Sequence, residues 1–145
     1  FRFEKLDVWH KAIDFSDVVY RVTRSFPSEE RFGLTSQVRR SAVSVSANIA
    51  EGSGRATDRD FARFVGIAYG SLMESISHLE IARRQSFLDE DNYRVLYSQA
   101  DRLARMLSGL KNSLGGSTGR GLLHRKAIRF VSQLALFVFC PASEA

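Results

Sequence analysis

Residues 89–114 read DEDNYRVLYSQADRLARMLSGLKNSL, and this stretch decides the fold class. Polar and charged side chains such as Arg94, Asp101 and Arg105 share one side of the pattern, and Gly115-Gly116 ends it. The apolar residues recur every three or four positions, which is the spacing of one helix face: Leu96, Ala100, Leu103, Leu107, Leu110 and Leu114. The sequence therefore predicts a long amphipathic helix over these residues.

Three further stretches show the same period toward the N-terminus, over residues 57–85, 35–51 and 6–25. Thr57-Asp58-Arg59-Asp60 is typical of a capping box that starts the first of these, while Gly52 is expected to end the second and Pro27 the third. No stretch alternates convincingly with period two. We therefore predict an all-α protein, an antiparallel up-down four-helix bundle over residues 1–114 with a C-terminal extension.

The extension, residues 115–145, differs in character from the rest. Gly115 to Gly121 form a glycine-rich linker, and residues 122–140 are basic at their start and apolar at their end. With Arg129 and Gln133 inside it, the apolar run is too short for a transmembrane helix. We expect a poorly packed extension; a fifth helix and a segment on a membrane surface are the alternatives.

Composition limits the class of protein. The 145 residues suit one soluble domain, and the single cysteine, Cys140, excludes an internal disulfide framework and favours the cytoplasm. Residues 1–9 contain no apolar segment of the kind found in secretory signals. The net charge of +5 comes almost entirely from arginine, which suits phosphate recognition, although bulk charge alone is a weak indication of nucleic-acid binding.

Catalytic chemistry is not indicated. Glu74 and His78 lie one helical turn apart, but a di-metal bundle needs two Glu-x-x-His pairs, so we expect an exposed hydrogen-bonded pair. Ser108 and Lys111 have the Ser-x-x-Lys form of some acyl enzymes without its companion motifs, and Cys140 has no convincing partner base. We predict a binding protein rather than an enzyme, with no catalytic residue, metal or cofactor.

Arginines cluster where the second helix leads into the third. Arg55, Arg59 and Arg63 recur every fourth residue after the loop Gly52-Ser-Gly-Arg55, beside a helix start whose free N–H groups favour anions. With Arg39 and Arg40 they could form one basic patch that contacts phosphates. The alternative is that these arginines pair with nearby carboxylates: Glu51, Asp58 and Asp60.

Two other patterns have more than one interpretation. A polar stripe on the second helix predicts either a buried hydrogen-bonded network or a small groove: Gln37, Ser41, Ser44, Asn48 and Glu51. Gly66-x-x-x-Gly70 predicts close helix packing.

Apolar surface in excess of one core predicts self-association. The first helix adds a row to its core face, and the third has a second, partly small and apolar face. These surplus residues are Trp9, Ile13 and Tyr20 on the first helix, and Gly66, Gly70, Met73 and Ile81 on the third. Such surfaces need covering, and a homo-oligomer is the usual solution.

The motifs in this order resemble a known family. Residues 3–12 (FEKLDVWHKA), 32–41 (FGLTSQVRRS), 44–52 (SVSANIAEG) and 68–71 (AYGS), with Gly54-Arg55 and Glu74, resemble the four-helix bundle proteins first associated with intervening sequences in bacterial 23S rRNA genes. The accessory protein of diversity-generating retroelements is similar. Asn48, Glu51, Gly52 and Arg55 match the central motif of the family, to which no catalytic role attaches.

The resemblance, which covers residues 1–114, implies a ring or barrel of typically five subunits. In the retroelement relatives this assembly engages nucleic acid and a reverse transcriptase. We therefore expect a homo-oligomer, such as a pentamer, that associates with RNA or DNA, with no role for a membrane. The alternative is an interaction scaffold whose partner is another protein and whose charge serves mainly solubility.

Overall fold

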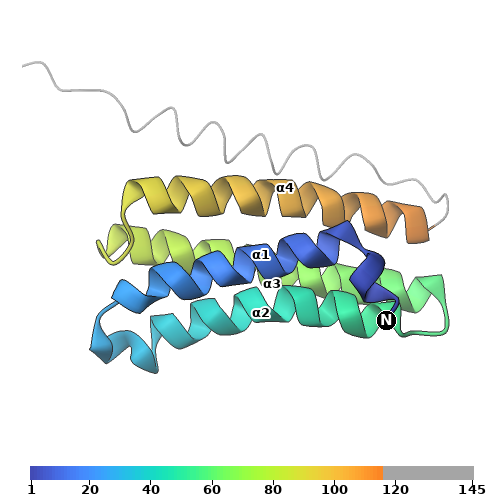
Figure 1. Ribbon diagram of the computed structural model, residues 1–145, viewed down its shortest axis with the longest axis horizontal. Helices are drawn as coiled ribbons and strands as arrows, with labels where there is room; N and C mark the ends of the chain where they lie inside the picture. Colours follow the sequence, from blue (N-terminus) through green and yellow to red (C-terminus); the bar gives the residue numbers. More distant parts are fainter. Residues whose placement is uncertain (116–145) are drawn as a thin grey trace, which may run out of the picture.

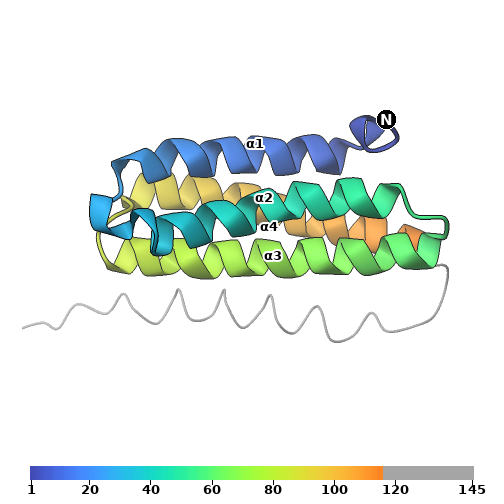
Figure 2. The same cartoon turned by 90° about the horizontal axis from the view of Figure 1, so that it is seen from below.

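The computed structural model describes residues 1–115, and these form a bundle of four antiparallel helices (Figures 1 and 2). The helices are α1 (Asp7–Val22), α2 (Leu34–Ser53), α3 (Asp58–Arg84) and α4 (Glu90–Leu114), with short 3-10 turns at Phe3–Lys5, Thr23–Ser25 and Ser28–Arg31. The described residues contain no strand, so the all-α bundle is confirmed. The predicted extension beyond Gly115, with Cys140, lies outside the described residues.

Neighbouring helices in the chain are neighbours in space, and α1 closes the bundle against α4. The predicted apolar faces all point inward, as the spacing of three to four residues requires. The largest side chains without solvent exposure come from every helix: Phe15, Ile49, Leu72, Leu79, Leu96, Leu103 and Leu107. These side chains fill one continuous core, and burying them supplies most of the stability of the fold.

Small polar side chains hold α2 close to α3. The Ser75 hydroxyl lies 2.9 Å from that of Ser41, and the Ser44 and Ser71 hydroxyls are also 2.9 Å apart. Asn48 Nδ2 donates to the Ser44 carbonyl at 2.7 Å. Of the residues predicted to form a network, Ser44 and Asn48 do so, and Ser41 of the same stripe joins α2 to α3 through Ser75. The other two members of the stripe, Gln37 and Glu51, are exposed and contact arginines instead.

One predicted helix end was wrong. The first helical stretch reaches Ser25 as predicted, since α1 ends at Val22 and a 3-10 turn follows directly over Thr23–Ser25. Gly52, predicted to end the second helix, remains inside α2, which continues to Ser53 and is capped at Gly54.

Gly52 serves packing rather than termination. A Cβ atom at this position would lie 2.6 Å from Phe64 Cβ and 2.7 Å from Phe61 Cδ2, both on α3. Such distances are shorter than any van der Waals contact between carbons. The absence of a side chain at Gly52 therefore lets the end of α2 approach the first turns of α3.

Helix α3 ends in a Schellman motif, which begins the connection to α4. The Phe87 N–H donates to the Ala82 carbonyl at 2.9 Å and the Ser86 N–H to that of Arg83 at 3.0 Å. Ser86 occupies the left-handed position, with φ of 59°. Asp89 then caps α4 by accepting the Asn92 N–H at 2.8 Å.

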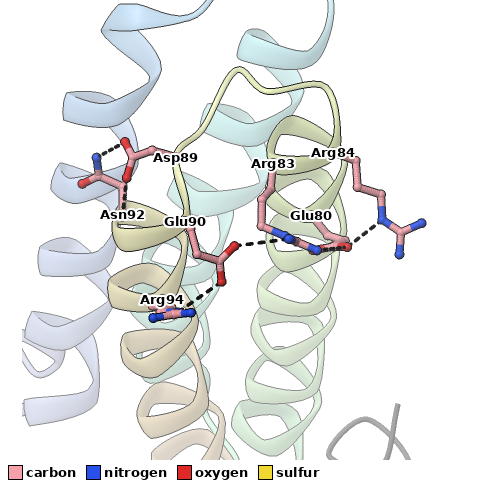
Figure 3. Close-up of polar contacts among 7 residues, drawn as sticks. All are labelled: Glu80, Arg83, Arg84, Asp89, Glu90, Asn92 and Arg94. Atoms are coloured by element: carbon pink, nitrogen blue, oxygen red, sulfur yellow. Dashed lines mark hydrogen bonds and ion pairs between the residues drawn. The ribbon is translucent and has the colours of Figure 1, made fainter. Parts of the chain in front are cut away.

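Ion pairs join the two helices beside this connection (Figure 3). Glu80 accepts hydrogen bonds from Arg83 at 2.9 Å and from Arg84 at 2.7 Å, and Arg83 also reaches Glu90 at 3.2 Å. The hydrogen bond from Arg83 is the largest cause that lowers the pKa of Glu80 from 4.5 to about 2. The ionised carboxylate is therefore a stabilising element of the α3–α4 hairpin.

A pH-dependent loss of stability follows from this pKa. Because the pKa of Glu80 is lower in the folded than in the unfolded chain, its contribution is complete above pH 4.5 and is lost as the pH falls toward 2. We expect Glu80→Gln to lower the free energy of unfolding by about 1 kcal/mol at neutral pH, a value reduced by solvent screening, and by almost nothing near pH 2. Urea unfolding across pH measures this, and a constant difference would contradict it.

Candidate nucleic-acid interface

The first turns of α3 place Arg59 and Arg63 on one exposed face. Thr57 starts the helix by accepting the Asp60 N–H at 3.1 Å, and its hydroxyl donates to the Asp60 carboxylate at 2.7 Å. Thr57 thus caps the helix as the predicted capping box requires. The Asp60 carboxylate accepts from the Thr57 hydroxyl instead of from the Thr57 N–H. Arg63 follows Arg59 by four positions, so the two arginines lie about one helical turn apart.

A shallow, open depression of about 560 Å³ lies at this end of the bundle. Figure 1 shows that α3 begins where α4 ends, and both helices contribute to it. Its lining residues are Thr57, Arg59, Asp60, Ala62, Arg63 and Lys111. Three of these side chains are cationic and one is a carboxylate, so the depression is positively charged.

The three cations of this depression, Arg59, Arg63 and Lys111, are called the cation cluster below. Within residues 1–115, none of the three takes part in an ion pair. All three residues are exposed. Their charges are therefore available to an anion from solution, and Asp60 is the one carboxylate among the described residues that line the depression.

Arg55 is adjacent but differently engaged. Its guanidinium pairs with Glu51 and lies over the Phe64 ring, with Cζ 4.6 Å from the ring centroid. Arg63 Cζ lies 5.6 Å from the same centroid. Pairing with a carboxylate, the alternative interpretation of these arginines, thus holds for Arg55, and among the described residues it does not hold for Arg59 and Arg63.

The five predicted arginines do not form a single patch. Arg40 pairs with Glu74 at 3.4 Å. Glu74 follows Arg63, the nearer arginine of the cation cluster, by eleven residues of α3, which is roughly 16 Å along a helix. Arg39 donates to the Thr23 hydroxyl at 2.8 Å and stacks over Tyr20. Arg39 and Arg40 therefore lie well away from the cation cluster, and the prediction of one continuous patch was wrong.

Lys111 was missed by sequence reasoning. It follows Arg63 by 48 positions in a different helix, and its local Ser-x-x-Lys pattern gives no indication of a basic patch. The available signal is topological: in an up-down bundle the end of the fourth helix meets the start of the third. Charged residues in those two segments are expected neighbours once the topology is assigned.

Gly66 and Gly70 do not pack against another helix within the described chain. A Cβ at Gly70 would meet no described atom within 4 Å, and at Gly66 the nearest atom is Lys111 Nζ, at 3.4 Å. Both glycines lie on the outer face of α3 in line with three exposed residues. We call this surface the outer stripe of α3: Gly66, Gly70, Met73, Ser77 and Ile81. Close packing, if these glycines serve it, requires a second molecule.

Glu74 and His78 are not a hydrogen-bonded pair, contrary to expectation, because Glu74 turns to Arg40 on α2. His78 Nδ1 is buried and has no hydrogen-bond partner among the described atoms. The described part of the chain holds no group of three or more His, Cys, Asp or Glu side chains placed to bind a metal ion. Nor does any helix within residues 1–115 have the length and hydropathy needed to cross a membrane.

Known proteins resemble this chain in both sequence and structure. The sequence model of a family described as 23S rRNA-intervening sequence protein matches residues 4–109. The crystal structure of a protein of unknown function from the S23 ribosomal protein family of Bacteroides thetaiotaomicron is similar, with a TM-score of 0.67 and 21% sequence identity. The similarity covers 72% of this chain and 98% of that one, and at this identity it shows the fold alone. No curated protein matches the sequence.

Proposed function

The chain belongs to the 23S rRNA-intervening sequence protein family, and from this premise we propose that it is a non-catalytic, homo-oligomeric bundle that associates with nucleic acid through the cation cluster. The expected ligand is the phosphate backbone of RNA. We place the protein in the cytoplasm, and the number of subunits is the five that the family resemblance implies.

The cation cluster is the observation that carries this proposal. Two helices bring Arg59, Arg63 and Lys111 to one open depression, and within residues 1–115 no ion pair engages them. Guanidinium groups bind phosphate oxygens through paired N–H donors, and an ammonium adds a point charge. A shallow, open, positively charged surface suits a strand laid across it better than a small enclosed substrate.

Uncovered apolar surface supports self-association. On the outer stripe of α3, Met73 is 41% and Ile81 46% exposed, and on the side of α1 and α2 Tyr20 is 44% and Val43 42% exposed. These two surfaces belong to different sides of one bundle. If the outer stripe of α3 in one copy contacted the exposed side of α1 and α2 in the next copy, the contact would be head-to-tail. Repeated head-to-tail contacts close into a ring when the rotation between copies permits.

The second candidate function is a protein-binding scaffold, and the same exposed apolar side chains favour it. A partner protein would cover the outer stripe of α3, and the charges of the cation cluster would then serve solubility. This candidate predicts no affinity for RNA.

Sedimentation of the full chain with a fluorescent single-stranded RNA tests both parts of the proposal. We expect the protein alone to sediment as an oligomer and the RNA to co-sediment with it at low salt. A monomer at every concentration would contradict self-association. An oligomer that leaves RNA unbound even at low salt would contradict the nucleic-acid function and favour the scaffold.

A further inference from the structure

The end of the Lys111 side chain, which comes from α4, lies beside Gly66 of α3. Its Nζ would lie 3.4 Å, and its Cε 3.9 Å, from a Cβ atom built on that glycine. The end of the lysine side chain thus lies against bare α3 backbone. Gly66 follows Arg63 by three residues, so this point lies on the same face as Arg63, one turn further along.

A Cβ at Gly66 would be in ordinary van der Waals contact with the Lys111 side chain, so a longer side chain at this position would compete with the lysine for the same space. Glycine is among the poorest helix formers, so a glycine in the middle of α3 needs a reason. No helix packs against Gly66 within the described chain, where the nearest atoms to its missing Cβ belong to Lys111 alone. Gly109, in α4, is exposed, and a Cβ there would meet no described atom within 4 Å. Because Gly109 lies outside the outer stripe of α3, it serves as the comparison for Gly66.

We propose that Gly66 is a positioning residue that seats Lys111 beside Arg59 and Arg63, so that three cations from two helices bind the phosphodiester backbone of a single RNA strand. This inference rests on the proposed nucleic-acid function. It assigns Lys111 as the third phosphate-binding cation and Gly66 as the residue that positions it. Arg59 and Arg63 lie about 6 Å apart along α3. With Lys111 added from α4, the charge extends over more than one phosphate, as binding of a strand requires.

Three variants of the full chain test whether Gly66 positions Lys111: Lys111→Gln, Gly66→Met and Gly109→Met. Methionine fills space, favours helix and leaves every charge in place. We expect Lys111→Gln to weaken RNA binding about three- to tenfold at low salt, and to reduce the slope of log affinity against log salt by about 0.7. Gly66→Met should reproduce both changes by displacing Lys111. Gly109→Met, the matched control on α4 and outside the outer stripe of α3, should reproduce neither.

The double variant Gly66→Met with Lys111→Gln decides whether Gly66 acts through the lysine. If it does, the methionine causes no further loss once Lys111 is gone. The same loss in both backgrounds would overturn the proposal, and so would wild-type binding by either single variant. The double variant Arg59→Gln with Arg63→Gln distinguishes failure of this inference from failure of the proposed function. If it weakens RNA binding while the Lys111 and Gly66 variants do not, only this inference fails. If no variant changes binding, the proposed function fails with it.

Discussion

Replacing Arg59, Arg63 and Lys111 together by glutamine is expected to lower the affinity for single-stranded RNA by about 100-fold or more at low salt. Each of these side chains is exposed, and none has an ion-pair partner within residues 1–115. The substitutions therefore remove three phosphate contacts without leaving a buried charge unpaired. For the same reason, the free energy of unfolding should change little.

Fluorescence anisotropy with a labelled RNA measures this loss, and circular dichroism verifies that the helices remain. The control removes the same number of positive charges elsewhere, by glutamine at Arg21, Arg24 and Arg102, which are exposed and outside the depression. It should bind nearly as well as the wild type. Equal losses in the two triple variants would show that net charge, rather than the cation cluster, determines binding.

Gly52→Val is expected to lower the free energy of unfolding by about 3 kcal/mol or more, or to prevent folding. Even the first carbon of the new side chain would lie 2.6 Å from Phe64 Cβ and 2.7 Å from Phe61 Cδ2. Phe61 is 3% exposed and belongs to the core, so its ring has little free space in which to yield. Relief would require α2 and α3 to separate, which breaks the contacts between their serines.

Urea unfolding of this variant should be compared with Gly54→Ala, two residues later. The nearest atom to a Cβ at Gly54 is the Glu51 carbonyl oxygen at 3.5 Å, an ordinary contact. We expect the Gly54 variant to unfold within about 0.5 kcal/mol of the wild type. If Gly52→Val lost less than about 1 kcal/mol, the close approach of the two helices would not depend on this glycine.

The architecture was predictable because periodicity depends only on local sequence. The leucines from Leu96 to Leu107 and the row from Phe61 to Leu79 identify their buried faces without knowledge of any partner. The serines of α2 were predictable for a related reason: small polar residues at the same period need hydrogen-bond partners once a neighbouring helix covers them.

What the sequence did not predict depends on distances between helices. From the sequence alone Gly52 is expected to end a helix. Only the positions of Phe61 and Phe64 beside it show that its role is close packing between α2 and α3. Arg39 and Arg40 resemble members of one patch until the axial separation along α2 and α3 is known. Lys111 can be recognised as a neighbour of Arg59 and Arg63 only when the end of α4 is known to lie beside the start of α3. Each of these properties is set by tertiary contacts, which no local pattern contains.

Whether RNA phosphates bind at the cation cluster can be measured by titrating the wild type and its triple glutamine variant with RNA in parallel across salt concentration. Three contacts to a single strand correspond to a slope of about −2 in log affinity against log salt for each site. The account predicts a log-linear decrease for the wild type and a slope less steep by about this amount for the variant. Identical slopes for the two proteins would contradict it, because the phosphates would then be bound somewhere other than Arg59, Arg63 and Lys111.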